Sequence, residues 1–184
     1  MSPLLIVLGL IVVGVLALIA IYTGLVSKRQ RCNQAFADVA VQLKQRQNLI
    51  PNLVETVKGY ASHEKETLDA VIQARNSAVA ANSAGDMAQA EGALSGALGK
   101  LFALAESYPD LKANQNFQSL QEELSLIEDK LAASRRFFNS AVQDYNTATE
   151  QFPGSIIAGS FDFQPREFFD VGEDRTALST VPDV

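Results

Sequence analysis

Residues 3 to 26 form an apolar stretch that contains no charged side chain. A helix rises ~1.5 Å per residue, so a helix of this length spans ~36 Å and can cross the ~30 Å hydrocarbon core of a bilayer. A buried helix of a soluble protein carries polar residues in most of its turns, and this stretch carries almost none. Tyr22 falls near its end, where an amphipathic ring suits the headgroup layer. The pattern predicts a single transmembrane helix within an anchor of residues 1–26.

A cleaved signal peptide is the alternative interpretation of this stretch. Signal peptides begin with basic residues, have a shorter apolar region and end in a small-x-small cleavage site. Here Met1-Ser2-Pro3 is uncharged, the apolar run is long, and Ala17 and Ala20 do not make an A-x-A site. Cys32 follows Gln30-Arg31 rather than small residues, which argues against a lipoprotein. We therefore expect the helix to be retained.

The residues after the span predict its orientation. Lys28, Arg29 and Arg31 follow it directly, whereas no Lys or Arg precedes it. Because basic flanks stay on the cytoplasmic side, we expect the N-terminus outside and the remaining chain in the cytoplasm. The free thiol of Cys32 agrees with a reducing compartment.

Residues 27–82 show apolar positions at alternating steps of three and four, which predicts one long amphipathic helix. Its inward positions are Phe36, Leu43, Ile50, Val54, Val57, Ala61, Leu68, Val71 and Ala78, with Gln47, Glu64 and Arg75 as polar interruptions. A proline inside a helix removes a backbone donor and clashes with the preceding turn, so a kink is expected between Asn48 and Pro51. Gly59 is a second weak point.

Residues 82–86 predict a turn, and a second helix is expected over 87–107. Asp86 followed by Gln89 resembles a capping box at its start. Its expected inward residues are Met87, Leu94, Leu98, Leu101, Leu104 and Tyr108. Three glycines fall roughly on one of its faces, and we expect them to allow close approach of another helix, within the chain or between subunits: Gly92, Gly96 and Gly99.

The most regular pattern predicts a third helix over 114–151. Its expected inward residues are Phe117, Leu120, Leu124, Ile127, Leu131, Ser134, Phe138, Ala141, Tyr145, Ala148 and Phe152. Pro153-Gly154 ends it, a short turn is expected at 155–160, and four phenylalanines beyond are expected to be buried against the bundle or a neighbour: Phe161, Phe163, Phe168 and Phe169.

These elements predict an all-α fold, with one N-terminal transmembrane helix followed by an elongated antiparallel bundle of long helices. The predicted domains are the anchor 1–26, a helical bundle 27–152, an aromatic segment 153–171 and a polar tail 172–184.

Charge is distributed unevenly beyond the span. Residues 28–75 carry eight Lys or Arg against five acidic residues, and residues 76–184 carry seven basic against sixteen acidic residues. The basic part lies next to the membrane, where it can meet anionic lipid headgroups; a solvated helix face is the simpler interpretation. The acidic remainder argues against nucleic acid as a partner.

No motif predicts a catalytic, cofactor or metal site. His63-Glu64 begins like the zinc motif H-E-x-x-H, but Thr67 replaces the second histidine and the chain has a single histidine. The acidic group of Glu122, Glu123, Glu128 and Asp129 is typical of an exposed helix face, with a cation site as the minor alternative. Basic neighbours could lower the pKa of Cys32, but an inert thiol is the expectation. We therefore predict no catalytic residues, no cofactor and no metal.

Within the span, Ala20 and Gly24 form a small-xxx-small pair, and Gly14 and Ala17 extend the same stripe. Such positions permit close helix packing in lipid. Self-association through the span is therefore predicted.

Several motifs are specific enough to compare with known families: Val41–Tyr60, His63-Glu64, Thr67-Leu68, Ala74-Arg75, Tyr108–Asn114 followed by Phe117, Leu120 and Leu124, Phe138-Asn139, Tyr145-Asn146, Phe152-Pro153, and the aromatic end at Phe161 and Phe168-Phe169. Through these motifs the chain resembles the LemA family over roughly residues 20 to 171. It implies a membrane-anchored helical bundle in bacteria, without an agreed activity and with no catalytic residues to carry over. Phe138 stands where a tyrosine is usual. The residues themselves indicate core packing for this aromatic stripe, with Asn139 and Asn146 able to hydrogen-bond across a helix interface.

Pattern and resemblance together predict a non-enzymatic scaffold or interaction protein in the bacterial inner membrane. We expect it to self-assemble, with the lipid bilayer and copies of itself as partners. The alternative is an adaptor or regulator of another membrane protein, such as a protease or signalling receptor. An enzyme is the least favoured interpretation, because no nucleophile and base are paired in the sequence.

Overall fold

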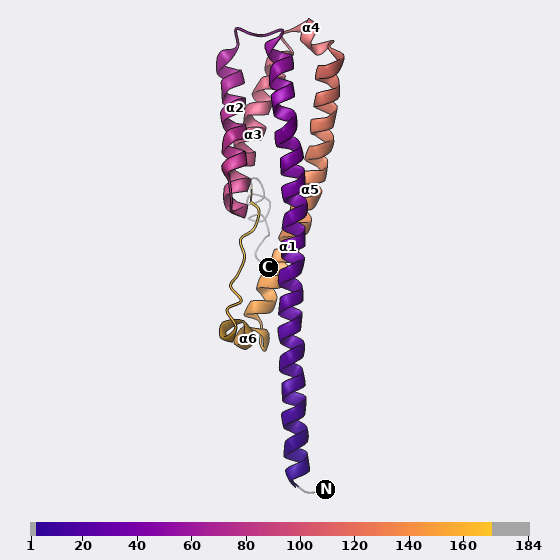
Figure 1. Ribbon diagram of the computed structural model, residues 1–184, viewed down its shortest axis with the longest axis vertical. Helices are drawn as coiled ribbons and strands as arrows, with labels where there is room; N and C mark the ends of the chain where they lie inside the picture. The colour runs from indigo at the N-terminus through magenta and orange to yellow at the C-terminus, as the bar shows by residue number, and fades with distance from the viewer. Residues whose placement is uncertain (1–2, 171–184) are drawn as a thin grey trace, which may run out of the picture. The chain divides into compact units, whose positions relative to one another are not determined.

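The computed structural model describes residues 3–170, and helices are the regular structure of that range (Figure 1). They are α1 (Pro3–Lys58), α2 (Lys65–Ala80), α3 (Ala84–Ala105), α4 (Pro109–Lys112), α5 (Gln115–Glu150) and α6 (Gly154–Ser160). The described residues contain no strand. The all-α prediction is confirmed, including the long N-terminal apolar helix and the helical bundle after it.

The described residues divide into two compact units, and α1 and α5 contribute to both. Unit 1 contains residues 3–37 and 137–167, and unit 2 contains residues 38–136 and 168–170. The predicted domain boundaries remain a prediction, and the polar tail 172–184 lies outside the described residues.

Unit 2 is a bundle in which four helices alternate in direction: the end of α1, then α2, α3 and the first part of α5 (Figure 1). Its core is apolar and draws on all four: Ile50, Leu53 and Val57 from α1, Leu68 and Val71 from α2, Leu94, Leu98 and Leu101 from α3, and Phe117 and Leu124 from α5. The predicted seam is confirmed from Leu43 to Ala78, and Phe36 is half-buried. A seam on each helix therefore closes a common core, as the spacing requires.

The single helix predicted over 27–82 is wrong, because α1 ends at Lys58 and α2 begins at Lys65. Gly59 follows α1 directly, and glycine has the largest conformational freedom to lose in a helix. Ala61 is buried in the turn, and its amide donates to the carbonyl of Val57 at 2.9 Å. The reversal places the apolar face of α2 on the core instead of in solvent. α1 continues through Pro51 without a break, and a bend there remains a prediction.

The start of α3 also differs from the prediction. The capping residue is Ser83, whose hydroxyl accepts a hydrogen bond from the Asp86 amide at 3.0 Å, so the box predicted from Asp86 to Gln89 is wrong. Serine is a strong N-cap, and Asp86 in the first turn suits the positive helix end. Leu94, Leu98 and Leu101 are buried as predicted, whereas Met87, Leu104 and Tyr108 are half-buried.

In unit 1 the end of α5 packs beside the part of α1 that contains Cys32 and Phe36. Phe36 and Phe138 lie with their rings 5.5 Å apart, and Phe138 is buried, so a tyrosine hydroxyl at this position would need a buried partner. The helix predicted over 114–151 is confirmed as α5 and the turn at 155–160 as α6. Phe152 was predicted to face inward and is instead 81% exposed, because α5 ends at Glu150 and no longer sets its direction.

The four C-terminal phenylalanines do not behave alike. Phe163 and Phe169 are buried, as predicted. Phe161 is 58% exposed and Phe168 is 44% exposed, so burial of all four against the chain's own described residues is wrong, whereas burial of these two against a neighbour stays a prediction. The segment after α6 is extended, and alternate side chains of an extended segment point in opposite directions, which explains the contrast between Phe168 and Phe169.

Candidate functional site

The first part of α1 is an apolar helix that the rest of residues 3–170 leaves uncovered. Every residue from 3 to 20 is exposed. Leu25 is the first fully packed side chain of the helix. In length and composition this helix is long and apolar enough to cross a membrane, which is consistent with a membrane anchor.

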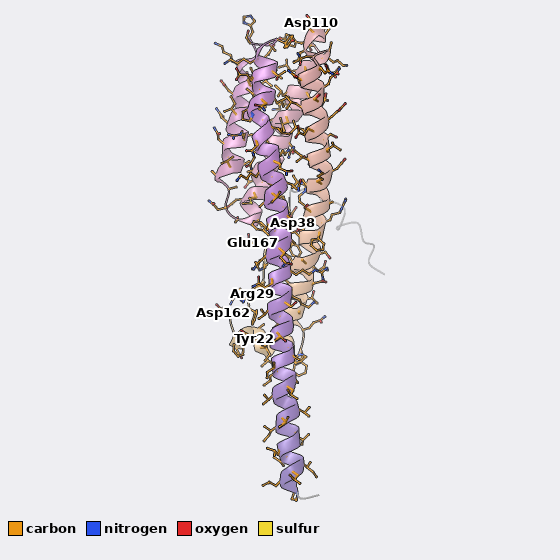
Figure 2. The ribbon with its side chains drawn as sticks, turned by 45° about the vertical axis from the view of Figure 1, so that its right-hand side comes forward. Tyr22, Arg29, Asp38, Asp110, Asp162 and Glu167 are labelled. Carbon is orange, nitrogen blue, oxygen red and sulfur yellow. The ribbon has the colours of Figure 1, made fainter. Side chains whose placement is uncertain are left out.

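Three aromatic rings lie together near the end of this stretch: those of Tyr22, Phe161 and Phe163. The ring of Tyr22 lies 5.1 Å from that of Phe161 and 5.6 Å from that of Phe163, both edge to face. The guanidinium of Arg29 lies 5.0 Å from the centre of the Phe163 ring, a cation–π distance. Asp162 accordingly lies between Tyr22 and Arg29 in height along α1 (Figure 2).

Two side chains of α5 hold the extended segment after α6 in place. The hydroxyl of Tyr145 donates to the Gln164 carbonyl at 3.0 Å. Asn146 donates from Nδ2 to the Arg166 carbonyl at 2.9 Å and accepts the Arg166 amide at its Oδ1 at 2.8 Å. Asn146 was predicted to bond across a helix interface; its partner is extended backbone. Burial raises the pKa of Tyr145, and the nearby Arg166 opposes this effect.

A buried polar network lies inside unit 2. Arg46 of α1 donates to Glu91 of α3 at 2.8 Å and to the Ser95 hydroxyl at 3.0 Å. The nitrogen that donates to Ser95, Nη2, also lies 2.9 Å from a carboxylate oxygen of Glu128 on α5, an ion pair without hydrogen-bond geometry. Burial raises the pKa of Glu91, and the charge of Arg46 opposes this effect. Spacing alone did not predict this network. The place of Arg46 one turn after Leu43, on the inward face of α1, was a usable signal.

Hydrogen bonds also fasten the loops at one end of unit 2. Tyr108 donates its hydroxyl to Glu64 at 2.9 Å, and this bond raises the pKa of Tyr108. Asn114 donates to the Tyr60 hydroxyl at 2.9 Å. Several residues that carry the family resemblance therefore have structural roles here.

The residues considered for chemistry remain apart. Cys32 is fully buried and donates to the Ala141 carbonyl at 3.1 Å, and burial raises the pKa of its thiol. A buried thiol with a raised pKa is unreactive, so the alternative of a lowered pKa is wrong. His63, Glu122, Glu123 and Asp129 are exposed, whereas Glu128 belongs to the buried network. Within residues 3–170, no three His, Cys, Asp or Glu side chains gather as a metal site would require.

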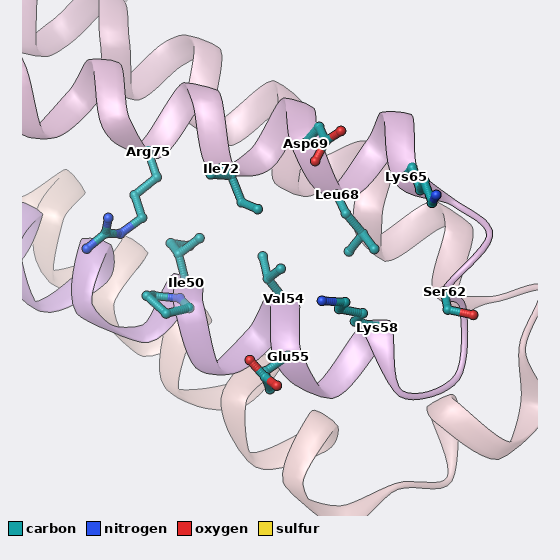
Figure 3. Close-up of a pocket in the computed structure, with 11 residues that line it drawn as sticks. Ile50, Val54, Glu55, Lys58, Ser62, Lys65, Leu68, Asp69, Ile72 and Arg75 are labelled. Carbon is teal, nitrogen blue, oxygen red and sulfur yellow. The ribbon is translucent and has the colours of Figure 1, made fainter.

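An open groove of about 480 Å³ lies between α1 and α2 in unit 2. Figure 3 shows Ile50 and Val54 of α1 facing Leu68 and Ile72 of α2 across it. Charged residues of both signs border the groove: Glu55, Lys58, Lys65, Asp69 and Arg75. The groove therefore has an apolar floor and a border of mixed charge.

Comparison with known proteins identifies the family. The family model described as the LemA family matches residues 35–184. The chain belongs to the LemA family. It is 23% identical to Magnetosome protein MamQ of Magnetospirillum gryphiswaldense, over 87% of this chain and 71% of that protein. It is 23% identical to Magnetosome protein MamQ 2 of Paramagnetospirillum magneticum, over 88% of this chain and 71% of that protein. Protein LemA of Metamycoplasma hominis is 28% identical, over 74% of this chain and 64% of that protein.

Proposed function

We propose that this LemA-family chain is a non-enzymatic, membrane-anchored scaffold or interaction protein that assembles with copies of itself at the bacterial inner membrane. One observation carries the proposal: the exposed apolar stretch and the first helix of the bundle are the same helix, α1. A helix with such an uncharged, exposed apolar surface is stable when lipid covers that surface.

The proposed orientation places the N-terminus outside and the helical units in the cytoplasm. It is supported by Lys28, Arg29 and Arg31, which follow the span within two turns. Arg29 and Arg31 lie over the rings of Phe163 and Phe137, which leaves their charge at the membrane-side end of unit 1.

Self-assembly is supported by a face of α3 that the rest of the described chain leaves open. A Cβ added to Gly92, Gly96 or Gly99 would meet nothing within 4 Å among residues 3–170, so no other helix of that range approaches closely at these glycines. Glycine costs ~1 kcal/mol relative to alanine in a helix, and three of them on one open face need another reason. Close approach of α3 from a second copy would explain these glycines. Approach between subunits was the second alternative that the sequence left open.

The non-enzymatic part of the proposal is supported by what happens to the candidate groups. The thiol of Cys32 is sealed in unit 1, and the imidazole of His63 is exposed on the turn between α1 and α2. A nucleophile needs a base within hydrogen-bond reach. Neither group has one among its hydrogen bonds in the described residues.

The test is the particle mass of the full-length protein extracted from membranes, measured by native mass spectrometry in detergent. Wild-type protein is expected to be oligomeric. Gly96→Leu is expected to shift the distribution toward monomer, because its side chain would enter the proposed interface. Ala70→Leu is the control, since Ala70 is also exposed on a helix of unit 2 but lies on α2, away from the glycine face of α3. A strictly monomeric wild type would overturn self-assembly.

The groove between α1 and α2 favours a second candidate function, that of an adaptor for another membrane protein. Its apolar floor and mixed-charge border fit an amphipathic helix of a partner. Co-purification from native membranes separates the two functions. A foreign protein in fixed stoichiometry, lost on Ile72→Glu in the groove and retained on Gly96→Leu, would favour the adaptor.

A further inference from the structure

Unit 1 contains a second uncharged stretch, at the turn between α5 and α6. Residues 151–161 carry no charged side chain, in a chain in which 20% of residues are charged. Three large side chains of this stretch face away from the protein: Phe152 is 81% exposed, Ile156 60% and Phe161 58%. Other members of the stretch, Ile157 and Ala158, pack inward. The turn is therefore apolar on its outer side as well as on its inner side.

The contacts of this turn fix its level along α1. Phe152 lines a shallow groove together with Ile21, Gly24, Leu25 and Lys28. The ring of Phe161 lies against that of Tyr22. Ile21, Tyr22, Gly24 and Leu25 belong to the last turns of the uncharged stretch, and Lys28 is the first of the basic residues that follow it. The outer side chains of the turn thus lie at the level where the span passes from hydrocarbon to headgroups.

We propose that the turn between α5 and α6 inserts Phe152, Ile156 and Phe161 into the headgroup layer of the leaflet from which α1 emerges. This second membrane contact rests on the proposed anchoring by α1. Large exposed apolar patches mark interaction sites, and aromatic side chains favour the bilayer interface. The bilayer is the occupant that the contacts favour, because the patch is continuous with the lipid-facing surface of α1 through Tyr22 and Ile21.

The arrangement has a consequence for the protein on the membrane. A single transmembrane helix would by itself allow the rest of the protein to rotate about the helix axis. A second contact beside it fixes one side of unit 1 against the headgroups, with Lys28 and Arg29 at the same level to meet lipid phosphates.

The chain contains no tryptophan, so single tryptophans can report the depth of chosen positions. Full-length variants would be reconstituted in vesicles of phosphatidylethanolamine and phosphatidylglycerol carrying nitroxide-labelled lipids. Phe152→Trp and Ile156→Trp probe the turn, and both positions are exposed enough to accept a larger ring. Leu16→Trp probes the span. Phe137→Trp is the matched control, because Phe137 is an exposed aromatic over Arg31, which lies ~13 Å further along α1 than Tyr22.

The expected result is a loss of emission from the tryptophans at 152 and 156 with nitroxides near the headgroups, and little loss with aqueous iodide. The tryptophan at 16 is expected to lose emission with nitroxides deep in the acyl chains, and the one at 137 only with iodide. Quenching at 152 and 156 by iodide, as at 137, would overturn the inserted turn and leave the anchor intact. Protection from both quenchers would mean that protein covers the turn, as a second copy would, and would also overturn it. Absence of lipid quenching at 16 would overturn the anchoring itself.

Discussion

Arg46 and Glu91 form an ion pair inside the four-helix bundle, with their charged atoms 2.8 Å apart and their side chains only 7% and 2% exposed. The pair joins α1 to α3, and Glu128 joins it from α5. A buried ion pair is weak evidence for stability, because desolvation offsets much of the attraction. It does constrain register, however, since sliding α3 by one turn against α1 would separate the buried Glu91 from Arg46.

Replacing Arg46 by methionine is expected to destabilise the protein severely. The substitution keeps the apolar stem and leaves Glu91 buried without its counter-charge, which costs ~3–5 kcal/mol in comparable cases. Chemical denaturation of the full-length protein in detergent, followed by circular dichroism, measures the free energy of unfolding. Lys44→Met is the control, because Lys44 is an exposed cation on the same helix and should change that free energy by only ~0.5 kcal/mol. Equal effects of the two substitutions would contradict a structural role for the pair.

Glu91 also predicts how stability depends on pH. Burial raises the native pKa of this carboxyl, so the native state binds its proton more tightly than the unfolded state, where the pKa is ~4.3. Its contribution is fully present below the unfolded pKa and is lost as pH rises through the raised native pKa. The free energy of unfolding of the wild type relative to Glu91→Gln should therefore fall with rising pH above ~4.3. Arg46, Glu128 and Arg135 also face this site, so the comparison must be made against Glu91→Gln. A difference that stays constant or grows with pH would contradict the raised pKa.

The sequence predicted the features that follow from a repeated spacing of apolar residues. The apolar span, the seam from Leu43 to Ala78 and the full length of α5 all follow from helical spacing, and the structure confirms them. Errors occurred where one residue decides the outcome. Gly59 permits the reversal that separates α1 from α2, and Ser83 rather than Asp86 caps α3. The periodicity of apolar positions carries no information about where a helix ends or which residue caps it.

Contacts between residues far apart in the sequence were the other feature that helical spacing did not predict. Nothing in the spacing connects Arg46 to Glu91, or Asn146 to Arg166, because each partner is polar and unremarkable in its own neighbourhood. The direction of side chains outside the helices is likewise not encoded in helical spacing, which is why the exposure of Phe161, in the turn that ends α6, and of Phe168 beyond it was not predicted. The family resemblance singled out Tyr145-Asn146, and only the fold shows that their side chains hydrogen-bond to the backbone of the segment after α6.

Asn146→Ala is expected to release the segment after α6 while leaving the helices intact. It removes both hydrogen bonds to the Arg166 backbone, each of which contributes ~1 kcal/mol. Hydrogen exchange of the Arg166 amide should accelerate accordingly. Asn33→Ala is the control, because Asn33 is exposed on α1 in the same unit and its side chain bonds only locally to Gln30. Unchanged exchange at Arg166 in Asn146→Ala would mean that the two bonds do not restrain the segment.

Two glycines of α6 provide a closely matched test of how this short helix is seated. A Cβ on Gly154 would lie 2.2 Å from the Ala148 carbonyl oxygen, whereas a Cβ on Gly159 would meet nothing within 4 Å. Gly154→Ala must therefore displace the backbone of α5 or of α6, and it should lower the free energy of unfolding by ~2 kcal/mol or more. Gly159→Ala should be neutral or stabilising by up to ~1 kcal/mol, since it only removes backbone freedom from the unfolded chain. The same denaturation measurement decides between them. If Gly154→Ala were tolerated as well as Gly159→Ala, α6 could not lie as close to the end of α5 as the structure places it, and the level of Phe152 beside Ile21 and Leu25 would need to be revised with it.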